Sequence, residues 1–240
     1  TTAPTISSVS SSAPDGYYNA GDVINIQVVF SEIVNVIGSP QLALNSGGNA
    51  SYFSGTGTTT LTFQYTVAAG QNSTDLDYVA TNSLTLPGAA SIRDVVSINA
   101  TLTLASPGAA NSISDNQGII IDTVLPFISS ITVDTGNPPL NGIGTSNGTT
   151  QTSLVYTVNF NEPILVTSVD NSDFVDRYSG YAGYGTYPPV NGIVSGVSAI
   201  SPSGGYASSF TITVGTLSGT GTLHLDLVES GILLDRASND

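Results

Sequence analysis

The sequence predicts an all-β chain made of two antiparallel β-sandwich domains in tandem. Short runs of alternating apolar and polar residues, rich in valine, isoleucine, threonine, tyrosine and phenylalanine, are separated by glycine, asparagine, serine and proline. No stretch keeps the apolar spacing of an amphipathic helix. A strand that ends in a carboxylate occurs twice, as Phe30-Ser31-Glu32 and as Phe160-Asn161-Glu162, which is typical of tandem modules.

The alternating runs give the expected strands of each half. Those of the first half are Thr5–Val9, Val23–Phe30, Gln41–Asn45, Ala50–Ser54, Thr60–Val67, Leu76–Leu86, Ala100–Leu104 and Gly118–Ile121. Those of the second half are Ile128–Val133, Leu154–Phe160, Phe174–Arg177, Gly192–Ile200, Ser209–Val214 and Thr222–Val228. Short strands separated by turn residues at this spacing favour antiparallel sandwiches.

The domain boundary follows from a repeated opening. Both halves begin with proline, any residue, isoleucine and two serines, at Pro4 and again at Pro126. We therefore expect domain 1 at residues 1–123 and domain 2 at residues 124–240. Each half also carries an aspartate later in its sequence, in Ile92-Arg93-Asp94 and in Leu233-Leu234-Asp235. The linker is short, so the interface between the domains decides whether the pair is rigid.

The composition excludes several kinds of partner. There are 17 acidic residues against three arginines, no lysine and a net charge of -14, so nothing could neutralise the phosphates of nucleic acid or an anionic membrane surface. Cations are the favoured partners. Without cysteine there is no disulfide and no thiolate metal site. No apolar run approaches the roughly 18 residues of a membrane span, and a chain that begins at Thr1 is expected to be a segment of a longer protein.

Several motifs carry a resemblance to a known family. In the first half they are Asp15-Gly16-Tyr17-Tyr18-Asn19-Ala20-Gly21-Asp22, Phe30-Ser31-Glu32, Pro40-Gln41-Leu42-Ala43-Leu44, Asp75-Leu76-Asp77-Tyr78 and Ile121-Asp122-Thr123. In the second half they are Phe160-Asn161-Glu162, Ser172-Asp173-Phe174, Leu225-Asp226-Leu227 and Leu234-Asp235-Arg236-Ala237-Ser238-Asn239. Together they resemble the tandem Ig-like, cadherin-like repeats of very large bacterial surface proteins, which include adhesins and the repeats of a cyanobacterial swimming-motility surface protein.

This resemblance implies two Ig-like sandwiches on the bacterial cell surface, with neighbouring repeats of the same polypeptide as partners. It covers nearly the whole chain, but it concerns architecture and indicates fold better than function. Two departures stand out. Residues 94–99 replace a tighter turn of the family, and domain 2 stops at Asp240, before the expected last strand, which would leave one sheet edge unpaired.

The direction of successive strands sorts the acidic residues to the two ends of each domain. The residues that this places at the junction are Asp15, Asp22, Asp75, Asp77 and Asp122 of the first domain with Glu162, Asp235 and Asn239 of the second. Carboxylates about 4 Å apart repel by roughly 4 kcal/mol at an effective dielectric near 20, and a divalent cation reverses the sign of that energy. Oxygen ligands in this number suit Ca²⁺, so the sequence predicts calcium at the junction.

An alternative to this metal hypothesis and an extension of it follow from the sequence. Aspartate and asparagine also favour turns for backbone reasons alone, so the same residues could be solvated turn residues. By the same sorting, Glu32 and Asp94 mark the outer end of domain 1 and would form half a site for a preceding domain.

A tyrosine-rich stretch offers a second kind of site. Tyr178, Tyr181, Tyr184 and Tyr187 recur at every third residue of a glycine-rich loop. Tyrosine offers an apolar face and a hydroxyl, so this loop could contact a glycan or a partner protein. The alternative is a surface loop that folds over its own domain.

Catalysis has little support in the sequence. His224 is the only histidine, and there is no cysteine, lysine or Gly-x-Ser-x-Gly turn to build a nucleophile. A glycosidase with paired carboxylates is the catalytic alternative, but the acids already have a structural explanation. We therefore expect a non-enzymatic, extracellular structural segment of a bacterial adhesin or motility protein, stiffened by Ca²⁺. The alternatives are a glycan- or protein-binding module and a domain pair that accompanies an S-layer or an enzyme.

Overall fold

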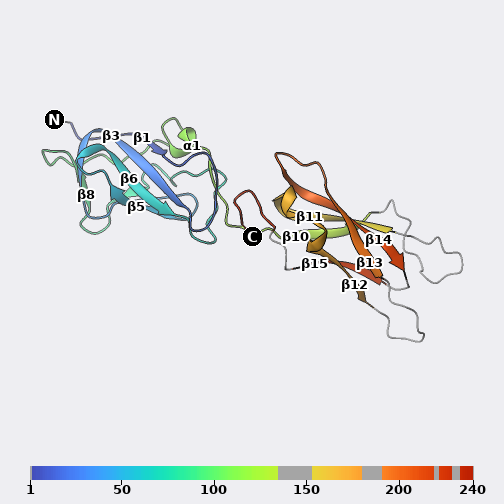
Figure 1. The fold of residues 1–240 in the computed structure, drawn as a ribbon. Coiled ribbons are helices and arrows are strands. Elements are labelled where there is room, and N and C mark those ends of the chain that lie inside the picture. The colour runs from blue at the N-terminus through green and yellow to red at the C-terminus, as the bar shows by residue number, and fades with distance from the viewer. Residues whose placement is uncertain (1, 135–152, 180–190, 219–221, 229–232, 240) are drawn as a thin grey trace. The chain divides into compact units, whose positions relative to one another are not determined.

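A computed structural model describes residues 2–134, 153–179, 191–218, 222–228 and 233–239. The chain divides into two compact units, unit 1 at Thr1–Val124 and unit 2 at Leu125–Asp240. The described residues form an all-β fold, as the alternating pattern predicts. Nearly all of their strand pairs are antiparallel, and helical structure in this described part is limited to α1 at Ile113–Asn116 and the 3-10 turns η1 at Val166–Ser168 and η2 at Asn171–Asp173 (Figure 1).

Unit 1 is organised around one large sheet. Its strands are β1 (Ile6–Ser11), β2 (Gly16–Tyr18), β3 (Val23–Ile37), β4 (Gln41–Ala43), β5 (Asn49–Ser54), β6 (Thr58–Thr66), β7 (Leu84–Thr85), β8 (Ser91–Arg93) and β9 (Ile119–Ile121). The sheet runs in the order β1-β3-β6-β5-β4-β7, with β8 paired to the far part of β3. Strands β2 and β9 form a separate parallel pair.

Unit 2 has two sheets among its described residues. Its strands are β10 (Ile128–Val133), β11 (Ser153–Leu165), β12 (Phe174–Ser179), β13 (Asn191–Ala199), β14 (Tyr206–Ser218) and β15 (Thr222–Leu227). The larger sheet runs in the order β10-β11-β14-β13, and β12 pairs with β15 in the smaller one. Phe174 and Leu225 of the smaller sheet pack with Val158 and Phe210 of the larger one, so the core lies between the two sheets.

Each unit has its own hydrophobic core, built by alternation along its strands. In β3 the residues Ile24, Ile26 and Val28 are buried, while the residues between them are not. In β11 the same alternation buries Leu154 and Tyr156, followed by further apolar residues. Because a strand turns successive side chains to opposite faces, a polar residue at every second position leaves one face solvated.

The order of strands is duplicated between the units. The path β1-β3-β6-β5 of unit 1 corresponds to β10-β11-β14-β13 of unit 2, and the pair β4-β7 corresponds to β12-β15. The long strand in the middle is β3 in unit 1 and β11 in unit 2. The two units therefore share their strand connectivity, although the internal similarity of the sequence is confined to short motifs.

The register of the first strand pair is also the same in both units. Ile6 of β1 lies opposite Phe30 of β3, and Ile128 of β10 lies opposite Phe160 of β11. In both pairs the register shifts immediately afterwards, as a β-bulge. A register shift of one residue would turn every side chain of a strand to the opposite face of the sheet. A bulge at the same place in both units is therefore strong evidence of a structural repeat.

The second strand pair repeats in the same way. The pairing of β3 with β6 is interrupted between Val29 and Val34, and that of β11 with β14 between Asn159 and Ile164. The interruption contains the Phe-x-Glu motif of each unit. The repeated motif thus marks the place where the long strand stops pairing with the first strand of its unit, β1 or β10, and continues beyond it.

Two expected strands are wrong. Of Leu76–Leu86 only Leu84–Thr85 is a strand, because the carboxylate of Asp77 binds nearby backbone amides and competes with sheet pairing. Of Ala100–Leu104 only Thr101 forms an isolated bridge, with Thr5.

The alternating pattern did not predict the short strands β2 and β8 or the single turn of α1. The side chain of Ser112 caps α1 by accepting a hydrogen bond from the amide of Asp115, at 3.3 Å. These elements are too short to produce a periodic pattern.

The separate cores predict independent unfolding. Val28→Ala in unit 1 and Val158→Ala in unit 2 each remove two methyl groups from a side chain that is 0% exposed, so each should cost about 1–3 kcal/mol of unfolding free energy. Hydrogen exchange followed by mass spectrometry should show the loss of protection only in the unit that carries the substitution. Val23→Ala, at a position that is 50% exposed, serves as the control. Loss of protection in both units from one substitution would show that they share a core.

Candidate functional site

The Asp94 turn of unit 1 is organised by one carboxylate. Oδ1 of Asp94 accepts hydrogen bonds from the backbone amides of Val96 at 2.9 Å and Ile98 at 2.7 Å. The amide of Asp94 in turn donates to the carbonyl of Ile98, at 2.9 Å. Asp94 is 3% exposed. Its carboxylate therefore takes the place of water as the hydrogen-bond acceptor for two partly buried backbone amides of the turn.

The Asp235 turn of unit 2 repeats this arrangement atom by atom. Oδ1 of Asp235 accepts from the amides of Ala237 at 2.7 Å and Asn239 at 2.9 Å. Its second oxygen, Oδ2, accepts from Nδ2 of Asn239 at 2.7 Å. Both turns also hold a serine in the left-handed region, Ser97 at φ 72° and Ser238 at φ 64°. Such a conformation is uncommon for residues other than glycine, so the shared serine geometry extends the repeat to the end of each unit.

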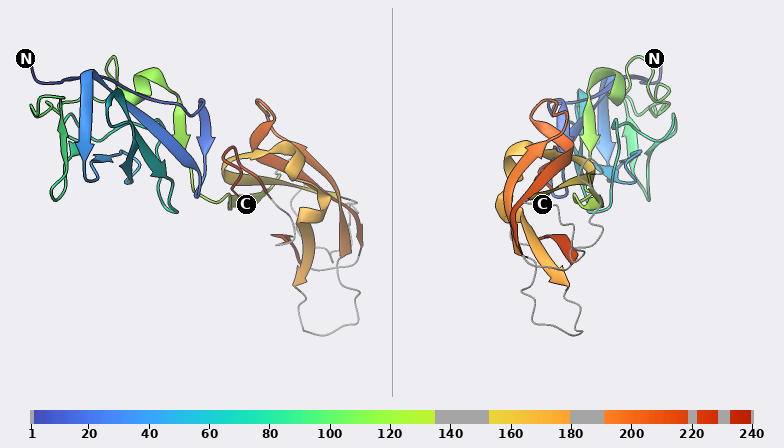
Figure 2. Two further views of the ribbon diagram at one scale, coloured as in Figure 1. Left: turned by 60° about the vertical axis from the view of Figure 1, so that its left-hand side comes forward. Right: turned by 90° about the vertical axis from the view of Figure 1, so that its right-hand side faces the viewer.

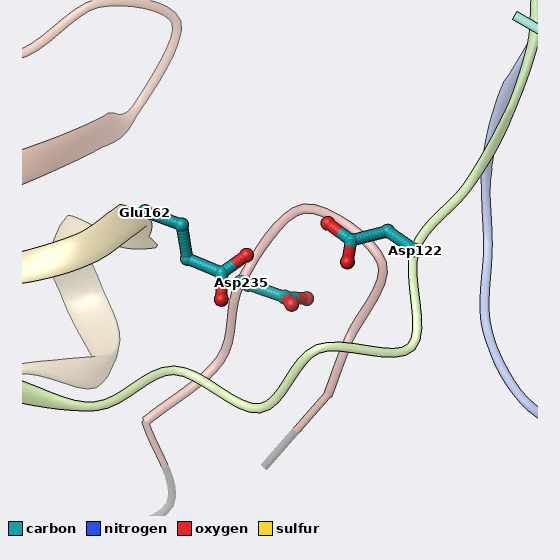
Figure 3. Close-up of side chains that lie close together, drawn as sticks. All are labelled: Asp122, Glu162 and Asp235. Carbon is teal, nitrogen blue, oxygen red and sulfur yellow. The ribbon is translucent and has the colours of Figure 1, made fainter. Parts of the chain in front are cut away.

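Glu162 and Asp235 are brought together within unit 2. The amide of Leu165, at the end of β11, donates to the carbonyl of Leu234 at 2.7 Å, which holds the turn beside the strand. A carboxylate oxygen of Glu162 then lies within 4.8 Å of one from Asp235 (Figure 3). Two carboxylates at this separation repel each other, and a cation between them would relieve that repulsion.

Glu32 and Asp94 occupy the corresponding places in unit 1. Glu32 follows Phe30 in β3 as Glu162 follows Phe160 in β11, and β8 pairs with β3 just before the Asp94 turn. Among the described residues, Glu32 and Asp94 belong to no group of three acidic side chains within metal-ligand distance.

The start of unit 2 is tied to the residue before Glu162. The amide of Phe127 donates to Oδ1 of Asn161 at 2.6 Å, and Nδ2 of Asn161 donates to the carbonyl of Leu125 at 3.4 Å. Asp122 precedes Leu125 by three residues, and three residues of extended chain reach at most about 11 Å. Chain connectivity alone therefore keeps the Asp122 carboxylate in the neighbourhood of Leu125, whichever way the two units are oriented.

The role of Asn161 was missed by the sequence analysis. The motif Phe-x-Glu has Ser31 at this place in unit 1, and Oγ of Ser31 accepts from the amide of Thr5 at 3.0 Å. Both middle residues thus fix the start of the first strand of their unit. A polar residue between the phenylalanine and the glutamate in both copies was the available signal.

Asp15 and Asp22 have local structural partners. Oδ1 of Asp15 accepts from the amide of Gly118 at 2.8 Å, and Oδ2 of Asp22 accepts from the amide of Asn19 at 2.8 Å. Burial raises the pKa of the Tyr18 hydroxyl, and the negative charges of Asp22 and Asp15 raise it further. Both negative charges therefore disfavour ionisation of the Tyr18 hydroxyl.

Asp77 is buried and accepts from four donors. They are the amides of Tyr78 at 2.8 Å, Gly108 at 3.0 Å and Ile113 at 3.4 Å, and Oγ of Ser114 at 2.7 Å. Asp77 is 3% exposed. Both of its oxygens are engaged, so this carboxylate anchors the segment that contains α1.

Asp75 lies beside Asp77 but is exposed. Partial burial raises the pKa of the Asp75 carboxyl, and the Asp77 charge raises it further. Within the described part of the chain, Asp15, Asp22, Asp75 and Asp77 join no group of three acidic side chains at metal-ligand distance.

The tyrosine site cannot be placed from the described residues. Tyr178 lies in β12, but its side chain is outside the described part of the structure, and Tyr181, Tyr184 and Tyr187 lie outside it entirely. The side chain of His224, in β15, is also outside the description. Among the described residues, the helices are too short to cross a bilayer.

No protein-family model, curated protein or solved structure that was searched matches this chain. The internal repeat of the chain is therefore the main indication of its function.

The two aspartate turns should contribute alike to stability. Asp94→Ala should lower the unfolding free energy of unit 1, and Asp235→Ala that of unit 2, by about 1–3 kcal/mol each, because amides that are partly buried in unit 1 and buried in unit 2 lose their acceptor. Urea unfolding, with hydrogen exchange to assign each transition, would measure both. Asp75→Ala, at an exposed carboxylate, should have little effect, and an equally small effect of Asp94→Ala would show that water replaces its carboxylate.

Unit 1 should lose stability in alkali because of Tyr78. This side chain is 1% exposed and its hydroxyl donates to the carbonyl of Ala105 at 2.9 Å. Burial, followed by the Asp77 charge, raises the pKa of Tyr78 from 10.0 to about 12. The stability from the protonated hydroxyl is complete below the unfolded-state pKa and is lost as the pH rises toward the folded-state value.

The alkaline loss can be measured by unfolding unit 1 between about pH 9 and pH 12, the window that these two pKa values set. Tyr78→Phe should cost about 1 kcal/mol at neutral pH and should make the alkaline decline shallower. Tyr17→Phe, at a tyrosine that is 37% exposed, is the matched control. An unchanged alkaline slope in Tyr78→Phe would contradict the assignment.

Proposed function

We propose that this chain is a structural segment of a bacterial cell-surface adhesin or motility protein, made of two Ig-like, cadherin-like sandwich repeats that act as a spacer. One observation carries the proposal: the units repeat the same strand order, the same bulge and the same aspartate turn. In this duplicated module the buried carboxylates of Asp94 and Asp235 stabilise backbone turns. Such an organisation is typical of a structural repeat. Neighbouring repeats of the same polypeptide are its partners.

The proposal includes one Ca²⁺ held by Asp122, Glu162 and Asp235, with Asn239 as a further oxygen donor. The donor set supports it, since it consists of carboxylate and amide oxygens, which Ca²⁺ prefers. The close pair of Glu162 and Asp235 within unit 2 supplies the electrostatic reason, and the short chain from Asp122 to Leu125 supplies the reach. The ion would contribute positive charge to a chain of net charge -14.

The mechanical consequence follows from where these ligands belong. Asp122 is part of unit 1, whereas Glu162 and Asp235 are part of unit 2. An ion that they share would restrict the torsion angles of the short connection and limit the relative motion of the units. A stiff connection lets tandem domains project a distal region away from the cell surface.

Calcium should stabilise the protein through Glu162. With an affinity of about 10⁻⁴–10⁻³ M, about 10 mM Ca²⁺ should add roughly 1.4–2.7 kcal/mol to the unfolding free energy of unit 2. A chelator should reverse the gain. Thermal unfolding with and without Ca²⁺, on the unsubstituted chain and on Glu162→Gln, would measure it, and Glu162→Gln should lose most of the gain.

Glu32→Gln is the matched control, because Glu32 holds the same strand position in unit 1 with the same intermediate burial. It should keep the calcium response. Backbone ¹⁵N relaxation should also show that Ca²⁺ slows the independent tumbling of the units and that Asp122→Asn abolishes this change. An equal calcium response in Glu162→Gln and the unsubstituted chain would refute the site.

A further inference from the structure

The outward face of the large sheet of unit 1 carries a row of side-chain amides. Asn25 of β3 lies opposite Gln64 of β6. Gln64 in turn lies opposite Ser51 of β5, which lies opposite Gln41 of β4. Residues directly opposite each other in neighbouring strands share a face of the sheet, and the row is about 14 Å long because its strands lie roughly 4.8 Å apart. Gln27, two residues beyond Asn25 in β3, adds a further amide to the same face.

The elements that follow the sheet in the chain leave this face uncovered. Helix α1 lies beside the edge of β1, where Nδ2 of Asn116 donates to the carbonyl of Val9 at 3.0 Å (the green helix and the dark blue strand in Figure 2). Ile113 of α1 and Ile119 of β9 belong to the core, on the inward side of the sheet. The four residues that carry the amides remain partly exposed, and Ser51 is exposed.

The strands that form this face are almost free of charge. Strands β1, β4, β5, β6 and β7 contain no acidic or basic residue, and β3 contains only Glu32, which lies within the interruption of its pairing with β6. Charged residues ordinarily make up much of a protein surface, and the chain has 17 acidic residues to place. A neutral polar face in so acidic a chain favours a neutral polar partner over an ionic one.

Unit 2 builds the same sheet without these amides. The aligned registers of β3 with β6 and of β11 with β14 match three amide positions of unit 1 with strand-forming residues of unit 2. Asn25, Gln27 and Gln64 correspond to Val155, Thr157 and Thr213. Valine and threonine are enriched in strands, whereas asparagine is depleted. The fold does not require the amides of unit 1, and departures of this kind from local preference are expected at functional sites.

The amides of unit 1 also keep hydrogen-bonding capacity for a ligand. Nε2 of Gln64 donates to Oδ1 of Asn25 over 3.4 Å, which is long for such a bond. Asn159, on the outward face of unit 2, is held more tightly, because its Nδ2 donates to Oγ of Ser130 at 2.9 Å and its Oδ1 accepts from Oγ of Ser209 at 2.6 Å. A primary amide offers two donors and an acceptor with two lone pairs, so most of this capacity in Gln64 and Asn25 is available to a partner.

Phe53 provides an apolar surface on the strand next to β6. The pairing of β5 with β6 shifts between Tyr52 and Ser54, so Phe53 is the extra residue of a bulge. The ring of Tyr52 packs edge-on against Phe63 of the core, with 6.0 Å between the ring centroids, whereas Phe53 is 62% exposed. An exposed aromatic ring near primary amides suits a sugar, which has an apolar C–H face and a rim of hydroxyls.

We propose that the outward face of unit 1 binds a neutral polysaccharide, with the amides of Asn25, Gln27, Gln41 and Gln64 bonded to sugar hydroxyls and Phe53 against the face of a sugar ring. This activity goes beyond that of a spacer, because it gives unit 1 a ligand of its own. The site shares no residue with the proposed calcium ligands, so either proposal can fail alone. A protein is the less suitable partner, since the centre of a protein interface is largely apolar.

Native electrophoresis of the full chain through gels that each contain one polysaccharide tests the proposal. Dextran, mannan and a neutral β-glucan are the probes, and the anionic polymer alginate is the control. At least one neutral polymer should retard the chain, and alginate should not. Gln27→Thr combined with Gln64→Thr, which copies the residues of unit 2, should weaken the apparent affinity by about tenfold, the change expected when two hydrogen bonds are lost.

Further measurements separate a loss of binding from a loss of folding. The double variant should unfold at the same temperature as the unsubstituted chain or at a higher one, because threonine favours strands. Asn35→Thr, at an exposed amide in the far part of β3, should leave the affinity unchanged. In ¹⁵N-correlated spectra, the side-chain amide signals of Gln27 and Gln64 should shift when the retarding polymer is added.

The proposal is overturned if none of the three neutral polymers retards the chain, or if the double variant is retarded as strongly as the unsubstituted chain. It is also overturned if treating the retarding polysaccharide with a protease, which is then removed, abolishes the retardation. A protein in the preparation would in that case be the ligand.

Discussion

The long bulged strand is the constraint on which both units depend. In unit 1 it is β3, which pairs with β1 and β6 along its first part and with β8 beyond Val34. Its alternating residues supply the centre of the core, so its register decides which side chains of three neighbouring strands are buried. In unit 2, β11 does the same for β10 and β14. The break in pairing that begins just before the phenylalanine lets one strand serve two sets of partners.

The aspartate turns depend on that strand. Because the strand continues past the bulge, the chain near Leu234 can pair with the amide of Leu165, and the turn that begins at Asp235 lies beside Glu162. The repulsion between these two carboxylates is therefore a consequence of sheet geometry. The Asp235 carboxylate could not move away without giving up the hydrogen bonds that it makes within its own turn.

Alternation made the long strands predictable. The prediction was wrong where side-chain hydrogen bonds stabilise a turn in place of a strand. The runs around Ile24–Phe30 and Leu154–Phe160 have a period of two and a buried face, so the sequence located them, although their continuation past the glutamate was not expected. The segment around Leu76–Tyr78 also alternates, yet the Asp77 carboxylate draws four donors around it and prevents a strand. Local sequence does not show which distant amides will reach a carboxylate. For the same reason, the sequence grouped Asp15, Asp22, Asp75 and Asp77 as ligands, while the structure gives Asp15, Asp22 and Asp77 separate backbone donors.

The parallel pair β2–β9 bears on how unit 1 would respond to stretching. Strand β9 is the last strand of unit 1, and its three residues run in the same direction as Gly16–Tyr18. A pull on the chain beyond Ile121 acts along the axis of β9 and loads all the hydrogen bonds of this pair in shear at once. Bonds loaded in this way must break together, whereas a peeled edge loses them one at a time. Strand β9 can therefore act as a mechanical clamp where the chain leaves the unit.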